Sequence, residues 1–196
     1  MILFFDTETT ALRPGKICQL SYIMQTKDGA TAKNFFFSVP FVEPSAVAVH
    51  GLTTEKLAVL SGGKRFSDHL EEIAQDFSSA DLIVAHNFSF DFNFMSKEFE
   101  YEYERFTYKQ DFCTMKKFTP ICKLARPSSP CYKYPKLSEL ADFLDIYSYD
   151  ATRTALNLFG DTGSAHDARY DTAMLYLCFN AGAKYEEVKT AMENCL

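Results

Sequence analysis

Two acids near the start of the chain, Asp6 and Glu8, are the first residues suited to chemistry. They lie two positions apart at the end of an apolar run, and the two-residue period of a β-strand puts both side chains on one face. Neighbouring carboxylates repel each other, so burying them together is costly unless a cation neutralises them. Oxygen ligands of this kind suit Mg²⁺ or Mn²⁺ better than Zn²⁺. The pair indicates a divalent-metal site, although Asp-x-Glu also occurs in solvated turns.

Two further acids follow histidines at the same interval. Asp91 comes five residues after His86, and Asp171 comes five residues after His166. At ~100° per residue, five helical positions leave two side chains about 140° apart, so His166 and Asp171 would not share a helix face. If both serve one site, His166 lies on a loop or first turn and Asp171 lies further along the helix. The alternative for Asp91 is an acid on a helix surface.

The apolar pattern predicts the elements that position these residues. Strands are expected at four apolar or β-branched runs, of which the first three would form an antiparallel meander. These runs are 2–5, 17–26, 34–39 and 81–85. Helices are expected where apolar residues recur at helical spacing or follow a capping residue. These segments begin at residues 53, 67, 88, 136, 164 and 185, with a break at Gly182 between the last two.

The size and composition favour one globular domain. The chain has 196 residues, of which 47% are apolar and 23% charged. These values allow a sizeable core and exclude disordered, collagen-like and coiled-coil proteins. The net charge of −6 argues against a protein that coats nucleic acid through general positive charge. Any contact with nucleic acid must therefore be local.

Cysteine usage and the N-terminal residues bear on location. Six cysteines are scattered without a Cys-x-x-Cys pair, which favours reduced intracellular thiols over zinc ligands. The apolar start is broken by Asp6 after five residues, far short of the ~20 residues that span a bilayer. We therefore expect a cytoplasmic protein, or a nuclear one if the source is eukaryotic, with no membrane partner.

Charge is unevenly distributed along the chain. Residues 66–104 hold ten acids and one lysine, whereas residues 105–136 hold eight bases and one acid. The second segment also contains several tyrosines and phenylalanines, the mixture that single-stranded nucleic acid favours through backbone attraction and base stacking. It is a candidate phosphate-binding surface. The alternative is a basic face that only keeps the surface solvated.

Three short motifs occur in the order and spacing of a known enzyme family. They are FDTETT at 5–10, HNFSFD at 86–91 and HDARYD at 166–171. The sequence thereby resembles the DEDDh, or DnaQ-like, 3′–5′ exonuclease family. Two further segments are similar to that family, VHGLT at 49–53 and DFCT at 111–114.

The resemblance, which covers about residues 1–181, implies a fold and a reaction. The fold is α/β and RNase H-like, with a mixed central sheet flanked by helices. One exonuclease domain would occupy residues 1–196, with a short helix after residue 181. The reaction is hydrolysis of phosphodiester bonds from the 3′ end of single-stranded DNA, or of frayed ends, releasing nucleoside 5′-monophosphates. The cofactors would be two divalent metal ions, Mg²⁺ with Mn²⁺ able to substitute.

The resemblance also assigns roles to residues. The carboxylates that would hold the metal ions are Asp6, Glu8, Asp91 and Asp171. His166 would be the general base on the attacking water, a role that suits an imidazole because it titrates near neutral pH. The residues that would contact the substrate are Thr7, His50 and Asn87. For His50 and for His86, a purely structural role is an equally good interpretation.

Alternatives remain at this level. RNA could replace DNA as the substrate, and the chain could be a catalytically silent nucleic-acid-binding module with the same fold. A haloacid-dehalogenase-like phosphatase also begins with an apolar strand that ends in Asp-x-Asp. That class has a second Asp where this chain has Glu8, and it gives no role to His166 with Asp171. A homodimer and a partner in replication or repair are further expectations.

Overall fold

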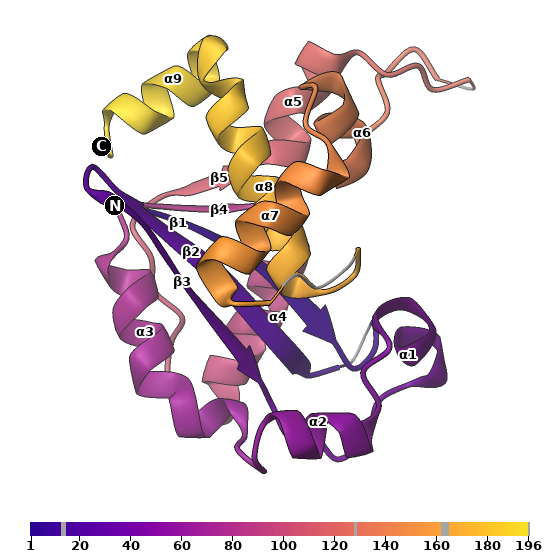
Figure 1. Ribbon diagram of the computed structural model, residues 1–196, viewed down its shortest axis with the longest axis vertical. Helices are drawn as coiled ribbons and strands as arrows, with labels where there is room; N and C mark the ends of the chain where they lie inside the picture. Colours follow the sequence, from indigo (N-terminus) through magenta and orange to yellow (C-terminus); the bar gives the residue numbers. More distant parts are fainter. Residues whose placement is uncertain (13–14, 128, 162–164, 196) are drawn as a thin grey trace.

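The computed structural model describes residues 1–12, 15–127, 129–161 and 165–195, and it centres on a five-stranded mixed sheet (Figure 1). The strands lie in the order β3-β2-β1-β4-β5. Their bounds are β1 Ile2–Thr9, β2 Ile17–Thr26, β3 Gly29–Phe36, β4 Leu82–Ala85 and β5 Asp111–Cys113. The first three are antiparallel, whereas β4 runs parallel to β1 and β5 parallel to β4. The predicted meander is confirmed.

The helices cover both faces of this sheet (Figure 1). They are α1 Pro44–His50, α2 Thr54–Leu60, α3 Leu70–Ser79, α4 Phe88–Tyr101, α5 Thr114–Cys122, α6 Leu137–Phe143, α7 Ser148–Phe159, α8 Ala168–Ala181 and α9 Glu186–Glu193. Two 3₁₀ turns, Phe66–His69 and Gly182–Lys184, precede α3 and α9. The sheet can therefore form a separate apolar core with the helices on each of its two faces.

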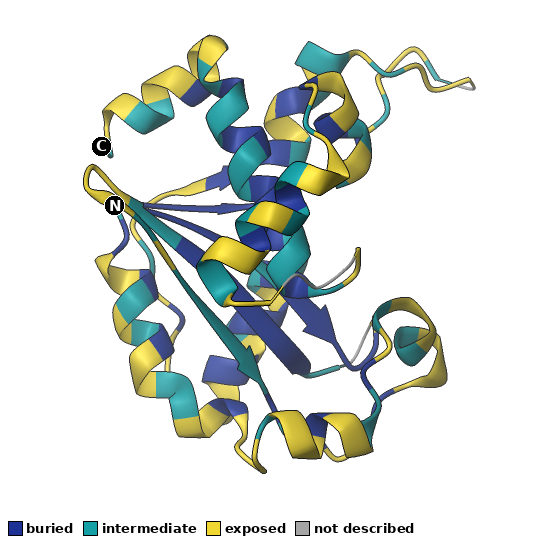
Figure 2. Cartoon of the chain, viewed as in Figure 1, coloured by how far each residue is buried: buried dark blue, intermediate teal, exposed yellow. Residues whose placement is uncertain are grey.

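Strand β1 lies at the centre because both of its faces are apolar. Ile2 and Phe4 pack into the core formed with α7 and α8, whereas Leu3 and Phe5 pack into the core formed with α3 and α4. The alternation of side chains along a strand produces this division. Figure 2 shows β1 buried along its length, between helices whose outer surfaces are exposed. The strand is therefore held rigidly at the point where its acids begin.

Strand β1 is longer than the apolar run predicts. It continues through the polar residues to Thr9, because β2 runs alongside it and pairs Asp6 with Ser21 and Glu8 with Gln19. The pairing of β2 satisfies backbone groups that a solvated turn would leave to water. Asp6 and Glu8 therefore belong to the rigid sheet, and the solvated-turn interpretation is wrong.

Other differences from the predicted elements have local causes. β3 begins at Gly29, not at residue 34, because its residues pair with β2 from the tight turn onward, from Thr26 with Gly29 to Gln19 with Phe36. The elements β5, α1, α5 and α7 were not predicted. The expected capping residue Ser164 lies outside the described residues, and α8 begins at Ala168 with Asp167 as its cap.

None of the helices in the described ranges is long and apolar enough to cross a membrane.

Candidate active site

Three carboxylates gather where β1 ends. Asp6, Glu8 and Asp171 each offer one carboxylate oxygen, and these oxygens lie within 4.8 Å of one another. Asp6 and Glu8 come from one face of β1, and Asp171 comes from the first turns of α8, which packs across that face. The sheet and the helix that covers it therefore bring together acids that are 163 to 165 positions apart in the chain. A group of this size and composition can bind a divalent cation.

The fourth acid, Asp91, lies next to this group but is held from the other face of the sheet. It belongs to the first turn of α4 and is only 3% exposed. The Thr7 hydroxyl donates a hydrogen bond to its Oδ1 at 2.7 Å. The charge of Asp91 is the largest neighbouring influence on the pKa of Asp6 after burial. All four predicted acids therefore belong to one electrostatic site.

Burial makes the negative charges of this site costly. It is the main cause that raises the pKa of Glu8 to about 9, of Asp91 to about 7 and of Asp171 to about 6, and it raises the pKa of Asp6 well above its usual range. For Asp6 and Glu8, neighbouring carboxylates raise the pKa further. A cation would favour the ionised forms that burial disfavours. The donor set therefore fits divalent metal ions.

His166 lies in the loop that leads into α8. The residue is exposed, and its backbone is in the left-handed region at φ 65°. Its backbone N–H donates to Oδ2 of Asp171 at 3.0 Å. The histidine therefore precedes the helix and Asp171 lies within it, as the 140° argument from the sequence requires. The charge of His166 also lowers the pKa of His50, after burial as the main cause. The two histidines are therefore close enough to interact electrostatically.

The three predicted substrate contacts have different surroundings. The Thr7 hydroxyl is occupied by Asp91. The ring of His50 bonds at both nitrogens, from Nε2 to the Thr9 carbonyl at 3.2 Å and from the Leu52 N–H to Nδ1 at 3.1 Å. Asn87 is exposed, in the left-handed region at φ 70°, at the junction between β4 and α4. Of the three side chains, that of Asn87 is the most accessible to a ligand.

His86 bonds at both ring nitrogens to other segments of the chain. Its Nδ1 lies 3.0 Å from Oγ1 of Thr114, and its Nε2 lies 3.0 Å from the carbonyl of Pro135. Burial lowers the pKa of His86 to about 4, so the ring is neutral at physiological pH. A neutral ring with both nitrogens engaged is a structural connection. Of the two interpretations left open by the sequence, the structural one holds.

A buried hydrogen-bond network next to the site was missed by the sequence analysis. Gln19 is fully buried in β2, and its Nε2 donates to Asp167 at 3.0 Å and to Asn34 at 2.9 Å. Arg169 donates two hydrogen bonds to the same Asp167 carboxylate, from Nε at 2.9 Å and from one terminal nitrogen at 2.7 Å. The feature of the sequence that could have indicated this network is a glutamine within an otherwise apolar strand. The network fixes the residue that follows His166.

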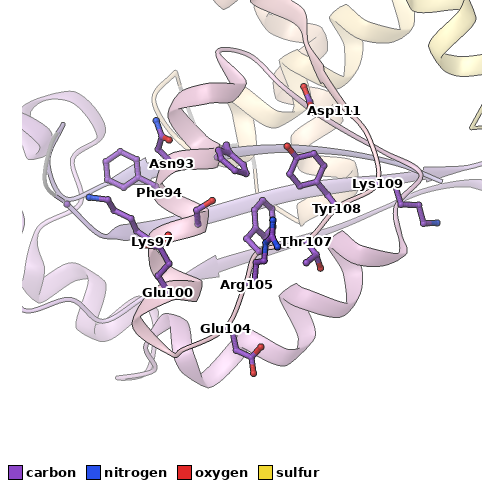
Figure 3. Close-up of a pocket in the computed structure, with 14 residues that line it drawn as sticks. Asn93, Phe94, Lys97, Glu100, Glu104, Arg105, Thr107, Tyr108, Lys109 and Asp111 are labelled. Atoms are coloured by element: carbon purple, nitrogen blue, oxygen red, sulfur yellow. The ribbon is translucent and has the colours of Figure 1, made fainter.

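A cavity of about 970 Å³ lies elsewhere, between α4 and the segment that leads to β5 (Figure 3). Its lining includes Phe94, Phe106 and Tyr108, with lysine, arginine, aspartate and glutamate side chains around them. None of the residues predicted for catalysis or substrate contact lines it. The acidic cluster therefore lies outside this cavity.

The sheet order and the acids at the end of its central strand define an RNase H-like fold of the exonuclease type. The family model described as "Exonuclease" matches residues 3–179. The chain therefore belongs to the DEDDh, DnaQ-like exonuclease family. No curated protein matches this chain at a significant level.

Solved structures of Exonuclease I share the fold. The apo form of Exonuclease I has a TM-score of 0.69 at 14% identity, over 95% of this chain and 42% of that one. The zinc-bound form of the E. coli Exonuclease I complex with single-stranded DNA has a TM-score of 0.67 at 16% identity, over 98% and 42% of the two chains. This chain spans less than half the length of these neighbours.

Proposed function

We propose that this protein is a metal-dependent 3′–5′ exonuclease that removes nucleoside 5′-monophosphates from single-stranded DNA or from frayed ends. The observation that carries the proposal is the cluster of Asp6, Glu8 and Asp171 at the end of β1, with Asp91 beside it. Two buried and two half-buried acids in one place have no structural use that would offset the cost of their repulsion. They do have a use as ligands of cations that neutralise an anionic substrate.

Asp6, Glu8, Asp91 and Asp171 would hold two divalent ions, Mg²⁺ or Mn²⁺. When bound, such ions lower the pKa of the attacking water and stabilise negative charge on the attacking and leaving oxygens. The protein contributes the fixed positions of the four carboxylates. Thr7 holds Asp91, and the backbone of His166 holds Asp171. Without cations, the same acids would repel a phosphodiester.

His166 would accept the proton of the attacking water at its imidazole. Its position in an exposed loop lets the ring reach a substrate, and the bond from its N–H to Asp171 ties it to the acids. An imidazole nitrogen can take a proton from water and release it to solvent in each turnover. The Gln19 and Arg169 bonds to Asp167 restrict the loop from its other side.

DNA is favoured over RNA as the substrate, because one solved neighbour is a complex of Exonuclease I with single-stranded DNA. RNA is the alternative, since discrimination depends on contacts with the 2′-hydroxyl group. Both substrates present the same phosphodiester to the acids. The comparison of the two sugars therefore belongs in the first experiment.

The proposal is tested with matched 5′-labelled single-stranded DNA and RNA oligonucleotides incubated with Mg²⁺, Mn²⁺ or EDTA. We expect a ladder that shortens from the 3′ end in the presence of metal and disappears in EDTA. Asp6→Asn should lower the rate at least ~100-fold, because it removes a ligand charge while preserving side-chain size. The preferred sugar is the one degraded faster.

A matched control is Glu187→Gln, which changes an exposed acid on α9. The carbonyl of Cys195, just after α9, accepts a hydrogen bond from the N-terminal amine of Met1. This helix therefore lies near the start of β1, at the opposite end of the strand from the acids. This variant should retain the wild-type rate. Shortening from the 5′ end, or cleavage in EDTA, would contradict the proposed mechanism. Tight binding of DNA without any cleavage would instead favour the silent binding module.

A further inference from the structure

The basic segment is anchored at the active site by His86. β4, whose Val84 pairs with Phe4 of β1, ends one residue later, so His86 lies beside the acidic stretch of β1. Its ring bonds to Thr114, the first residue of α5, and to the carbonyl of Pro135. His86 therefore joins both ends of the segment from Thr114 to Pro135, which comprises α5 and the loop that leads to α6. Both ends of that segment therefore lie at the carboxyl end of β4, the strand next to β1.

Between these two anchors, α5 is followed by a projecting arm, defined here as residues 123–127 and 129–135. Figure 1 shows it as the extended pink loop that leaves the body of the molecule between α5 and α6. Its two sides are joined by a hydrogen bond from the Lys133 N–H to the Leu124 carbonyl at 2.9 Å. The arm therefore has a defined shape and exposes both of its sides.

The arm carries exposed aromatic rings among positive charges. Tyr132 is 47% exposed and Tyr134 is 58% exposed. Together with Arg126, Lys133 and Pro120 of α5, they line a cavity of about 550 Å³. Residues 112–138 contain six bases and no acid, in a chain whose net charge is −6. This is the longest stretch of the sequence without an acid.

A second contact places a lysine of α5 at the first turn of α4. Nζ of Lys116 on α5 lies 3.2 Å from Oγ of Ser89. Ser89 belongs to the first turn of α4, two residues before Asp91 and two after the exposed Asn87. Lys116 therefore joins α5 to the first turn of α4, and the arm directly follows α5 along the chain.

We propose that α5 and the arm hold the single strand upstream of the scissile end, with bases stacked on Tyr132 and Tyr134 and phosphates beside Lys116 and Arg126. This inference rests on the proposed function. Stacking is tolerant of sequence, because every base presents a π-face, and lysine or arginine supplies attraction to the backbone. The arm therefore makes the enzyme prefer long single strands to very short ones.

Binding of 3-nucleotide and 20-nucleotide single-stranded DNA, each labelled at its 5′ end, is measured by fluorescence anisotropy with Mg²⁺, with every variant made in the Asp6→Asn background so that cleavage is slow. Tyr132→Ala/Tyr134→Ala should weaken binding of the 20-mer by about tenfold or more, from the loss of two stacking contacts. Binding of the 3-mer should change less than twofold. Lys116→Gln should weaken binding of the 20-mer and make its salt dependence shallower.

The matched control is Tyr147→Ala/Tyr149→Ala. These tyrosines are 69% and 68% exposed, but they lie at the start of α7, outside the basic segment. This double variant should bind both strands as the wild type does. An equal loss in both double variants, or no loss in the arm variant, would overturn the inference. All four tyrosines are exposed, so thermal unfolding should show that each variant folds.

The second readout is hydrolysis of the p-nitrophenyl ester of thymidine 5′-monophosphate with Mg²⁺, a diester too small to reach the arm. The arm variant should hydrolyse it at the wild-type rate while its KM for the 20-mer rises about tenfold. If no protein hydrolyses it but the arm variant still loses binding of the 20-mer, the catalytic proposal fails and the binding surface stands. If hydrolysis proceeds and the KM for the 20-mer is unchanged, the binding surface is wrong.

Discussion

At the scale of single residues, the acids of the site oppose folding when no cation is present. Glu8 is 9% exposed and its pKa is raised to about 9 by burial and by the charges of its neighbours. The folded protein must either keep this group protonated or bear a buried charge, and both states cost free energy at neutral pH. The acids of the site therefore lower the stability of the metal-free protein, and the same acids are suited to bind a divalent metal ion.

Glu8→Gln should stabilise the metal-free protein, by on the order of 1–3 kcal/mol at pH 8. The amide is neutral at every pH, so the penalty for the buried carboxylate disappears. Chemical denaturation in EDTA measures the free energy of unfolding of both proteins. The gain should shrink toward zero near pH 4, where unfolded carboxyls are also protonated; a gain of the same size at pH 4 would contradict the argument.

His86→Ala should destabilise the protein by about 1–3 kcal/mol, because it removes the hydrogen bonds of the ring with the Thr114 hydroxyl and with the Pro135 carbonyl. The lowered pKa of His86 adds a pH dependence. The unfolded imidazole gains a proton near pH 6.5 and the folded one only near pH 4, so the wild type loses stability as the pH falls through this interval. Urea denaturation at pH 7.5 and pH 4.5 measures both effects. The pH-dependent part should be absent from the variant, and a steeper loss in the variant would argue against a neutral ring.

At the scale of elements, the active site depends on how α8 is joined to β2. Thr172 of α8 donates a hydrogen bond to the Ser21 carbonyl at 3.2 Å, and Gln19 bonds to Asp167 just before the helix. These contacts fix the position of α8 along the strands of the sheet. That position determines where Asp171 lies relative to Asp6 and Glu8.

Gln19→Leu should lower kcat about tenfold with little change in KM, since small displacements of catalytic groups cost this much. The leucine fills similar space but leaves Asp167 and Asn34 without the amide, so stability should also fall by about 1–3 kcal/mol. Steady-state kinetics on DNA and thermal unfolding measure the two effects. A rise in KM with unchanged kcat would mean that Gln19 affects binding of substrate, not the loop of His166.

Gly182 lies at the junction between α8 and the turn before α9, at a position where a larger side chain does not fit. A Cβ added at this position would lie 2.6 Å from Cζ of Phe118. Gly182→Ala should therefore destabilise the protein by about 1–3 kcal/mol through overpacking. The double variant Gly182→Ala/Phe118→Leu should lose less than the sum of the two single variants. Additive losses in chemical denaturation would show that the two residues do not interact.

At the scale of the whole molecule, stability should depend on pH and on metal together. The metal-free protein should lose stability as the pH rises from about 5 to about 9. Unfolded carboxyls titrate near pH 4, whereas the folded Asp171, Asp91 and Glu8 have pKa values raised to about 6, 7 and 9. In this interval the folded state retains protons that the unfolded state has released, so raising the pH favours unfolding.

Mg²⁺ should reverse this trend. Metal binding needs ionised carboxylates, so the increase in Tm caused by a fixed concentration of Mg²⁺ should be larger at pH 8.5 than at pH 5.5. Differential scanning calorimetry with Mg²⁺ or EDTA measures the shift. Asp6→Asn should reduce it at both pH values. A shift that is independent of pH would argue against binding of the metal by these acids.

The sequence by itself determined the elements on which the predicted site residues lie. Asp6 and Glu8 follow an apolar run, and the two-residue period of a strand puts them on one face without any knowledge of the fold. The separation of His166 from Asp171 required a loop residue followed by a helical one, as observed. These features are local, so the pattern of neighbouring residues is sufficient to predict them.

The tertiary structure alone decided which side chains support the site. The bond from Thr7 to Asp91 joins residues 84 positions apart, and the bond from Gln19 to Asp167 joins residues 148 apart. The short strand β5 and the helix after it have only weak local patterns and are fixed by pairing with β4 and by the anchor at His86. Such contacts form only once the sheet brings distant segments together, and no periodicity along the chain encodes them.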